Sequence, residues 1–277
     1  MPAILSKPGV YPDLAEADYH ADPWPGGSLS CSGAKLLLPP GCPALYQWSR
    51  KTPRPPTSAM EFGTAAHREV LGAGWPYVVS PWADYKTKAA QEWAAEQRDV
   101  GKVPIKPEQR ERIVAMAAAI RTHPTAALLL SAEDVLAEHS FFWEDPDTGI
   151  MLRARFDAVK LAGRVVITDF KSAAHADPEG FAKAAANYRY HWQGVWYAQG
   201  VTHTLGDADP RFLFVAQEKE PPYLVGIYEL PWEAIEAAQA DIARARREYA
   251  RCVEAGEWPG YQPGQAITTL DWPRWAR

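Results

Sequence analysis

The sequence has few cysteines, no long apolar run and no excess of positive charge. Its 277 residues include 3 cysteines, which cannot supply the four thiolates of an iron–sulfur cluster, and an odd count argues against a disulfide framework. No stretch approaches the roughly 18 apolar residues that indicate a membrane span, and the N-terminus lacks the basic and then apolar pattern of a signal peptide. These absences predict free thiols at Cys31, Cys42 and Cys252, no iron–sulfur cluster, and a cytoplasmic protein that does not associate with a membrane.

The composition is that of an ordinary folded protein. Hydrophobic residues make up 47% of the chain and charged residues 23%, which is enough apolar surface for one good-sized core. We expect a single domain over 1–277, with an N-terminal arm and helix at 1–59, a core at 60–230, and a C-terminal helix and tail at 231–277. Residues 1–27 are rich in proline and glycine and are expected to form an extended arm.

Local patterns predict the elements of the fold. Helices are expected at 60–73, 84–99, 107–121, 124–131, 178–187, 190–203 and 232–255, and strands at 134–143, 150–160, 164–170, 211–217 and 223–229. Ser30 or Ser32 is expected to cap a short helix that ends at Leu38. The arginines of the last helix are expected on a solvated face, partnered by Asp241 and Glu248; they are Arg244, Arg246, Arg247 and Arg251.

The segment Arg153–Lys171 has the pattern of a β-hairpin. Apolar and polar side chains alternate along its first strand, which predicts two faces: Leu152, Ala154 and Phe156 on one, and Arg153, Arg155 and Asp157 on the other. Ala162-Gly163 supplies the turn, and the β-branched run 165–167 predicts a buried return strand.

The hairpin carries two acids and a base that together suit metal chemistry. Asp169 and Lys171 are two residues apart, so both side chains leave the same face, and Asp157 can lie beside them. Two neighbouring carboxylates repel each other unless a divalent cation lies between them, and Mg²⁺ prefers carboxylate, carbonyl and water oxygens. The Phe170 carbonyl is a further candidate ligand. A lysine beside such a cation can orient the attacking water or stabilise developing charge. The alternative is a surface ion pair worth less than about 1 kcal/mol.

Two further motifs flank the hairpin. Gly63-x-x-x-His67 precedes it and Gln193-x-x-x-Tyr197 follows it, each with its two residues on one helix face. With the acids and the lysine of the hairpin between them, these motifs resemble the PD-(D/E)XK nuclease superfamily in its RecB-like branch. The closest likeness is to the RecE (exonuclease VIII) type of phage and prophage exonuclease, and it covers residues 63–197.

The resemblance implies a fold and a set of roles. The fold would be α/β, with a central mixed β-sheet flanked by helices in the order αβββαβ and with N- and C-terminal elaborations. Mg²⁺, for which Mn²⁺ can substitute, would be the cofactor. The implied metal ligands and catalytic residues are His67, Asp157, Asp169, the Phe170 carbonyl and, as the catalytic lysine, Lys171. Gln193 and Tyr197 would support the site and contact DNA.

Some of these residues have ordinary structural alternatives. His67 could be a satisfied core histidine, and Gln193 and Tyr197 could simply pack in an aromatic-rich segment. The family often has glutamate where this chain has Asp169, a shorter acid that can still bind a metal ion. Glu138, in the strand before the hairpin, is not expected to reach one.

Basic side chains near the hairpin are candidates for DNA contact. Arg153 and Arg155 share the Asp157 face and are predicted to contact phosphates, with a charge-balancing pair as the alternative. The net charge of −5 and the pI of about 5.8 are unusual for a DNA-binding protein, unless positive charge is confined to a channel. The candidate sources of that charge are Lys35, Arg50, Lys51, Arg54, Arg153 and Arg155.

The resemblance implies a Mg²⁺-dependent deoxyribonuclease that resects linear double-stranded DNA ends in the 5′–3′ direction for single-strand-annealing recombination. The implied partners are DNA ends, a RecT-like annealing protein and further copies of the chain in a ring. The implied setting is the cytoplasm of a bacterial or phage-infected cell. Two alternatives stay open: a nicking or structure-specific endonuclease on the same fold, and a nuclease-fold DNA-binding module without catalysis.

Overall fold

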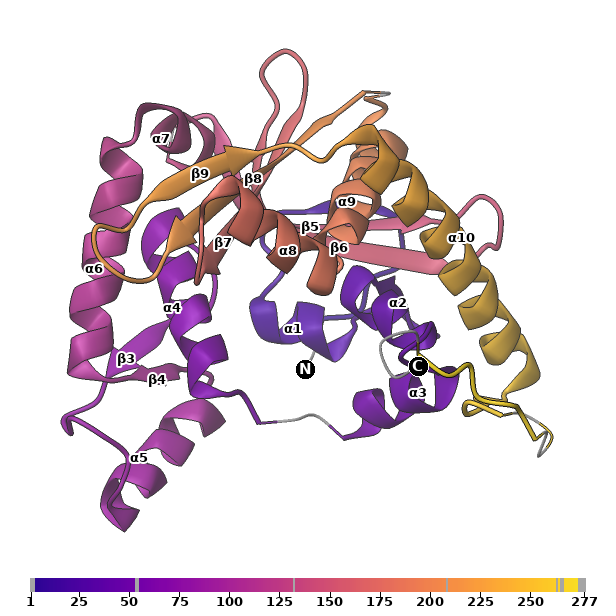
Figure 1. The fold of residues 1–277 in the computed structure, drawn as a ribbon, viewed down its shortest axis with the longest axis horizontal. Helices are drawn as coiled ribbons and strands as arrows, with labels where there is room; N and C mark the ends of the chain where they lie inside the picture. The colour runs from indigo at the N-terminus through magenta and orange to yellow at the C-terminus, as the bar shows by residue number, and fades with distance from the viewer. Residues whose placement is uncertain are drawn as a thin grey trace.

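A mixed β-sheet forms the centre of the molecule (Figure 1). The computed structural model describes residues 3–52, 55–131, 133–207, 209–262, 264 and 267–273. Within these residues the sheet has 7 strands, in the order β1-β5-β6-β7-β8-β9, with β2 paired to β6 beside this path. The strands are β1 (Gly9–Tyr11), β2 (Leu29–Ser30), β5 (Val135–Glu144), β6 (Met151–Lys160), β7 (Val166–Ala173), β8 (Arg211–Glu218) and β9 (Val225–Tyr228). β5, β6 and β7 form an antiparallel meander, and β7 and β8 are parallel.

Helices cover both faces of this sheet. On one side lie α4 (Ser58–Leu71), α6 (Pro107–Thr122) and α7 (Pro124–Leu130), and on the other lie α9 (Tyr190–Leu205) and α10 (Trp232–Ala255) (Figure 1). The order α4-β5-β6-β7-α9-β8 is the αβββαβ arrangement expected from the sequence. Among the described helices none is by itself long and apolar enough to cross a membrane; only α6 and α7 taken together meet that length and composition, and they are bent by 102°.

The remaining elements elaborate this core. The helices are α1 (Glu16–Ala21), α2 (Cys31–Leu37), α3 (Pro43–Lys51), α5 (Lys88–Asp99) and α8 (Pro178–Asn187). Two strands, β3 (Tyr77–Val79) and β4 (Val103–Ile105), form a separate parallel pair that flanks α5 in the sequence. The sequence patterns did not predict these two strands, because three residues are too few to show a period.

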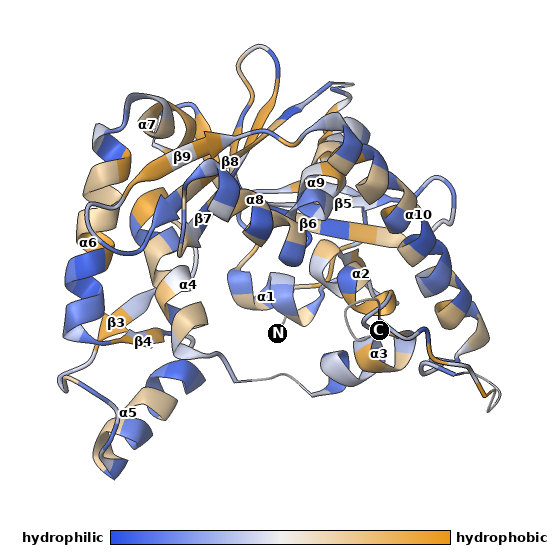
Figure 2. Ribbon diagram, viewed as in Figure 1, coloured by the Kyte–Doolittle hydropathy of each residue, from blue (hydrophilic) through white to orange (hydrophobic). Residues whose placement is uncertain are grey.

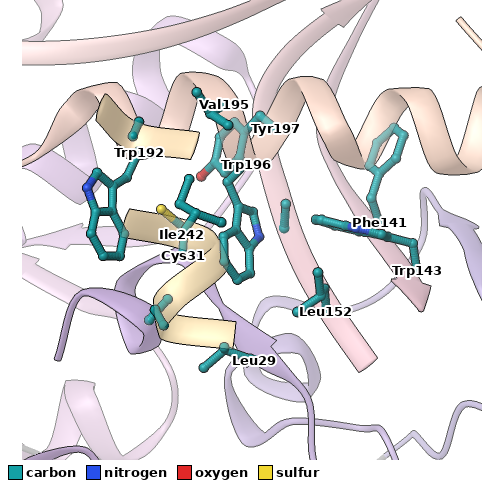
Figure 3. Close-up of a cluster of buried hydrophobic side chains, with 14 of the residues drawn as sticks. Leu29, Cys31, Phe141, Trp143, Leu152, Trp192, Val195, Trp196, Tyr197 and Ile242 are labelled. Carbon is teal, nitrogen blue, oxygen red and sulfur yellow. The ribbon is translucent and has the colours of Figure 1, made fainter. Parts of the chain in front are cut away.

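Each face of the sheet has its own hydrophobic core. On the α9 side, Trp192 and Trp196 pack with Trp143 and Leu152, and the Trp143 and Trp196 rings meet edge to face at 6.1 Å (Figure 3). On the α4 side, Phe170 of β7 packs with the helices α4, α6 and α7. In the hydropathy colours the strands β8 and β9 are largely hydrophobic, whereas α10 carries many hydrophilic residues (Figure 2). The sheet is therefore covered on both faces around the hairpin.

Most of the predicted elements are confirmed, with ends that differ by a few residues. The turn between β5 and β6 and the turn at Gly163 lie where the sequence predicted them, and Gly163 has a φ of 75° that favours glycine. Of the two candidate caps, Ser30 is the one used: its hydroxyl accepts a hydrogen bond from the Gly33 N–H at 3.2 Å. Arg54, one of the predicted channel cations, lies outside the described residues.

The expectation of an extended N-terminal arm is wrong for the described residues of 1–27. β1 pairs antiparallel with β5 and adds an edge strand to the sheet. Leu5, Leu14 and Tyr19 are buried and pack with Phe142 and Met151. The packing of this segment could not be predicted from the sequence, because its buried residues follow neither a helical nor a strand period and their partners are more than 100 residues away along the chain.

A buried ion pair ties α10 to the turn between β5 and β6. Arg246 donates hydrogen bonds to Asp145 at 2.8 Å and to Gln199 at 2.6 Å, and the second Asp145 oxygen accepts one from the Thr148 hydroxyl at 2.6 Å. Arg246 is thus buried, unlike the solvated position predicted for it. Arg244 and Arg251 do pair with Asp241 and Glu248, as expected.

Removing one partner of this buried pair is expected to destabilise the protein strongly. Asp145→Ala leaves the Arg246 guanidinium buried without its counter-ion, which costs about 3–5 kcal/mol in the free energy of unfolding. The control is Lys88→Ala, which removes an exposed ion pair with Glu92 at 3.4 Å and is expected to cost less than about 1 kcal/mol. Urea unfolding measures both values, and equal losses would contradict a structural role for the buried pair.

Candidate active site

The strands β6 and β7 diverge at Asp157. β6 pairs with β2 at Leu152 and Arg153 and with β7 at Ala158–Lys160, so its edge has no strand partner at Asp157 itself. Here the Phe170 N–H of β7 donates to the Asp157 carboxylate at 2.8 Å. Because the N–H and C=O of one strand residue point to the same side, the Phe170 carbonyl also turns toward this opening. We call this place the β6–β7 fork.

The regular alternation of β6 breaks at the fork. Phe156 and Val159 are three residues apart but belong to the same hydrophobic core, whereas strict alternation would put them on opposite faces. Beside the break, Glu138 of β5 has a φ of 56°, a left-handed conformation that is strained for a residue with a side chain. Strain of this kind is typical of functional sites.

Three potential metal ligands meet at the fork. Ligand atoms of His67, Glu138 and Asp157 all lie within 4.8 Å of one another. α4 carries His67, whose Nδ1 lies 3.4 Å from an Asp157 carboxylate oxygen and whose ring meets the Phe170 ring edge to face at 5.1 Å. Glu138, which was not expected to reach a metal ion, lies within this set of potential ligands, so that expectation is corrected. The available signal was a glutamate that follows three apolar residues at the start of a strand.

A second group of side chains adjoins the first. Lys171 Nζ lies 2.5 Å from Asp169 Oδ2, and the Gln193 amide donates to Asp169 Oδ1 at 3.3 Å. The Gln193 amide also lies 3.4 Å from the Tyr197 hydroxyl. Asp169, which the sequence predicts as a metal ligand together with Asp157, is 1% exposed and pairs with Lys171, and it lies outside the close set of three ligands. The four sequence motifs therefore meet in space, on elements α4, β6, β7 and α9.

The sequence matches one known family. Residues 30–267 match the family described as a PDDEXK-like domain of unknown function (DUF3799). The chain belongs to this PDDEXK-like family. None of the curated proteins matches the sequence. The crystal structure of the "Putative exonuclease" from Eubacterium rectale has the same fold, with a TM-score of 0.58 and 12% identity over 89% of this chain and 90% of that one. The structure of SSO0001 is more distant, with a TM-score of 0.28 and 11% identity over 76% of this chain and 86% of that one.

Burial and neighbouring charge shift the protonation of the PDDEXK-like site. Burial and the positive charge of Lys171 lower the pKa of His67 to about 4, although Asp169 opposes this shift, so the imidazole is neutral at pH 7. Burial and the negative charge of Asp169 raise the pKa of Asp157 well above its usual value. Burial and the charge of Glu16 raise the pKa of Glu138 to about 6.

Lys171 keeps its charge in spite of burial. Burial by itself disfavours the ammonium form, but the carboxylates of Asp169 and Asp157 outweigh it and raise the pKa of Lys171 above its usual value. The ammonium also lies 5.0 Å from the centre of the Tyr190 ring, where the electron-rich face attracts a cation. A charged donor is thus held beside the carboxylates.

The donor set fits a divalent cation. Carboxylate and carbonyl oxygens suit Mg²⁺ and Mn²⁺, and a neutral imidazole suits the transition metals better than Mg²⁺. His67, Glu138, Asp157 and the Phe170 carbonyl are the groups that could hold such an ion, and PDDEXK nucleases usually use divalent metals. Burial, with neighbouring negative charge, raises the pKa values of both carboxyls, and a bound cation would favour their charged forms.

The two arginines of β6, Arg153 and Arg155, form ion pairs and hydrogen bonds within the protein. Arg153 is 5% exposed and pairs with Asp22 at 2.7 Å, and it donates to the Ser28 carbonyl and hydroxyl. Arg155 donates to Glu138 at 2.9 Å and to the Leu14 carbonyl at 2.9 Å. These contacts favour the charge-balancing alternative over the predicted phosphate contacts. Arg155 in addition orients a carboxylate of the metal-ligand set.

Binding of Mn²⁺ is expected to release protons, and to release more at about pH 6 than at about pH 8. The raised pKa values keep a share of protons on Asp157 and Glu138 in the metal-free protein, and a bound cation displaces them. As the pH rises past a pKa, fewer protons remain to be displaced. His67 is already neutral and contributes none.

Calorimetry in two buffers with different heats of ionisation counts these protons. Glu138→Gln removes one titrating carboxyl and is expected to reduce the release at the lower pH. Release that does not change with pH, or that is the same in Glu138→Gln, would contradict this assignment.

Proposed function

We propose that this protein is a Mg²⁺-dependent deoxyribonuclease, and that it acts as a RecE-like 5′–3′ exonuclease on the ends of linear duplex DNA. One observation carries the proposal. Three potential metal ligands, a buried carboxylate and a charged lysine lie together at the β6–β7 fork. Membership of the PDDEXK-like family and the fold shared with the Eubacterium rectale protein support a nuclease.

The residues of the site divide the chemistry among them. A divalent cation held by His67, Glu138, Asp157 and the Phe170 carbonyl would activate water and neutralise charge on the scissile phosphate. The Lys171 ammonium can donate a hydrogen bond to the attacking water or to the phosphate oxygen on which charge develops. Gln193 holds the Asp169 carboxylate from the side opposite Lys171.

The exonuclease assignment rests on the order and spacing of the four motifs, which resemble those of RecE-type enzymes. On this basis the protein resects one strand at a DNA end and passes the other to an annealing protein of the RecT type. Assembly of several copies into a ring around DNA belongs to the same proposal. The ends of linear duplex DNA are then its substrate.

A partly buried, charged lysine argues against a catalytically inert DNA-binding module. Keeping the Lys171 ammonium charged inside the protein costs desolvation free energy, which the adjacent Asp169 and Asp157 offset. A module that only bound DNA would need neither this lysine nor a close set of ligands behind it. Their retention supports catalysis.

Lys171→Ala is expected to abolish nuclease activity without unfolding the protein. Loss of the ammonium removes a donor to the transition state and is expected to lower the rate of linear duplex degradation by at least about 100-fold. The matched control, Lys88→Ala, removes an exposed lysine far along the chain from the motifs and is expected to degrade DNA at the normal rate. Removal of divalent ions with EDTA is expected to stop degradation in every variant.

The assay compares linear and closed circular duplex DNA with Mg²⁺. Degradation of the linear form alone supports the exonuclease. Cutting of circles would replace it with an endonuclease on the same fold, and no cutting of either form would favour the inert module.

A further inference from the structure

Lys171 lines a cavity of about 890 Å³ whose wall does not include His67, Glu138 or Asp157. β7, α8, the turn after it and the first turn of α9 form most of its wall, and Met60 of α4 closes one edge. Lys171 and Ser172 of β7 lie at its inner end. A strand that placed a phosphate at Lys171 would therefore have a cavity beside the cut that is large enough for a small number of nucleotides.

Two stacked tyrosines stand at the border between this cavity and the site. The Tyr188 and Tyr190 rings lie 5.6 Å apart between centres and 24° from parallel. Tyr190 is next to the chemistry, because its ring centre is 5.0 Å from Lys171 Nζ. Tyr188 covers the outer side of this stack, and 65% of its surface is exposed. The core does not require a large aromatic side chain in that position, so its ring is free to take a further flat partner.

The turn that presents these rings is strained and braced. Arg189, between the two tyrosines, has a φ of 53°, a left-handed conformation that is unfavourable for arginine. Its guanidinium donates to the carbonyls of Lys35 and Pro39, and the Lys35 ammonium donates to the Tyr188 carbonyl at 3.0 Å. Contacts with α2 and the segment after it thus fix the backbone of an exposed aromatic residue, and strain held in this way is typical of ligand-binding positions.

The charge of the cavity suits a nucleic acid. Three lysines line it, Lys171, Lys183 and Lys219, against two carboxylates, Asp177 and Glu179. Lys183 pairs with Glu179 at 2.7 Å and Lys171 with Asp169 at 2.5 Å, so a phosphate would share these two ammonium groups with a carboxylate. The chain as a whole has a net charge of −5, so this wall is more positive than the protein average. Lysines beside an aromatic platform form the combination that single-stranded nucleic acids recognise, with phosphates on the cations and bases on the rings.

We propose that the Tyr188–Tyr190 stack seats an unpaired base of the DNA strand next to the scissile phosphate, and that the strand continues along the lysine-lined cavity. This inference rests on the proposed nuclease function and adds where the single strand lies. The base must be unpaired and unstacked, because in a duplex both faces of each base are covered by its neighbours. The protein thus holds its substrate melted on this side of the cut.

The test measures the binding of a short single strand with uncleavable phosphorothioate linkages and one 2-aminopurine base, with Ca²⁺ in place of Mg²⁺. Tyr188→Ala is expected to weaken binding by about 5- to 150-fold, the effect of removing one base–aromatic stack. Tyr188→Phe keeps the aromatic face and is expected to bind within about twofold of the wild type. The matched control is Trp232→Ala, which removes another aromatic residue that is 65% exposed but does not line the cavity, and its affinity is expected to be unchanged.

Fluorescence of the 2-aminopurine is expected to be quenched on binding to the wild type and to Tyr188→Phe, but not on binding to Tyr188→Ala. A closed circular duplex offers neither a strand end nor an unpaired loop, and its affinity is expected to be the same for all variants. Thermal melting checks that Tyr188→Ala is folded, as expected for truncation of an exposed side chain.

Four results would overturn the inference: no binding of the single strand by the wild type, normal affinity of Tyr188→Ala, an equal loss in Tyr188→Phe, or an equal loss on the closed duplex. This test is independent of the test of nuclease activity, because it measures binding in the absence of cleavage. If Tyr188→Ala weakens single-strand binding but the wild type cuts no DNA, the proposed nuclease function is contradicted and the base platform is not. If the wild type degrades DNA and Tyr188→Ala binds the single strand with normal affinity, the base platform is contradicted and the nuclease function is not.

Discussion

The hydrogen bond from the Phe170 N–H to the Asp157 carboxylate organises the whole site. In a continuous sheet this N–H would bond to a backbone carbonyl of β6, but here a side chain takes the place of the carbonyl and the strands diverge. The divergence turns the Phe170 carbonyl toward the opening and leaves room for the His67 ring. One hydrogen bond thus orients an acid and a carbonyl, and it places both beside an imidazole.

The cost of gathering negative charge in the interior is met by several distant segments. Glu138 is buried, Asp157 is partly buried, and both have raised pKa values; Arg155 holds Glu138 with a hydrogen bond of 2.9 Å. The described N-terminal residues take part, since the Leu14 carbonyl accepts from Arg155 and Glu16 lies 3.7 Å from it. Arg153 is in turn neutralised by Asp22. The segment expected to be a free arm is part of the electrostatic support of the site.

The elements and the site were predictable to different degrees. Long helices and strands such as 107–121 and 150–160 showed a clear period and were found within a few residues. The three-residue strands β3 and β4 showed none. Asp157, Asp169 and Lys171 could be named because their types and spacing match one chemistry, whereas Glu138 could not, because one acid in a strand has no pattern. Its position depends on a backbone φ of 56° that no sequence rule indicates.

The sequence by itself determined which groups could do chemistry, because residue type and spacing fix their charge and the face of the element from which they leave. It also indicated the family, since four motifs in order are rarely matched by chance. Only the tertiary structure decided which groups meet. Arg153 and Asp157 share one strand, yet the first is paired with Asp22 and the second faces His67. Contacts between residues far apart in the chain depend on how helices and strands pack, and local patterns of hydrophobicity carry no information about that packing beyond each element's own buried face.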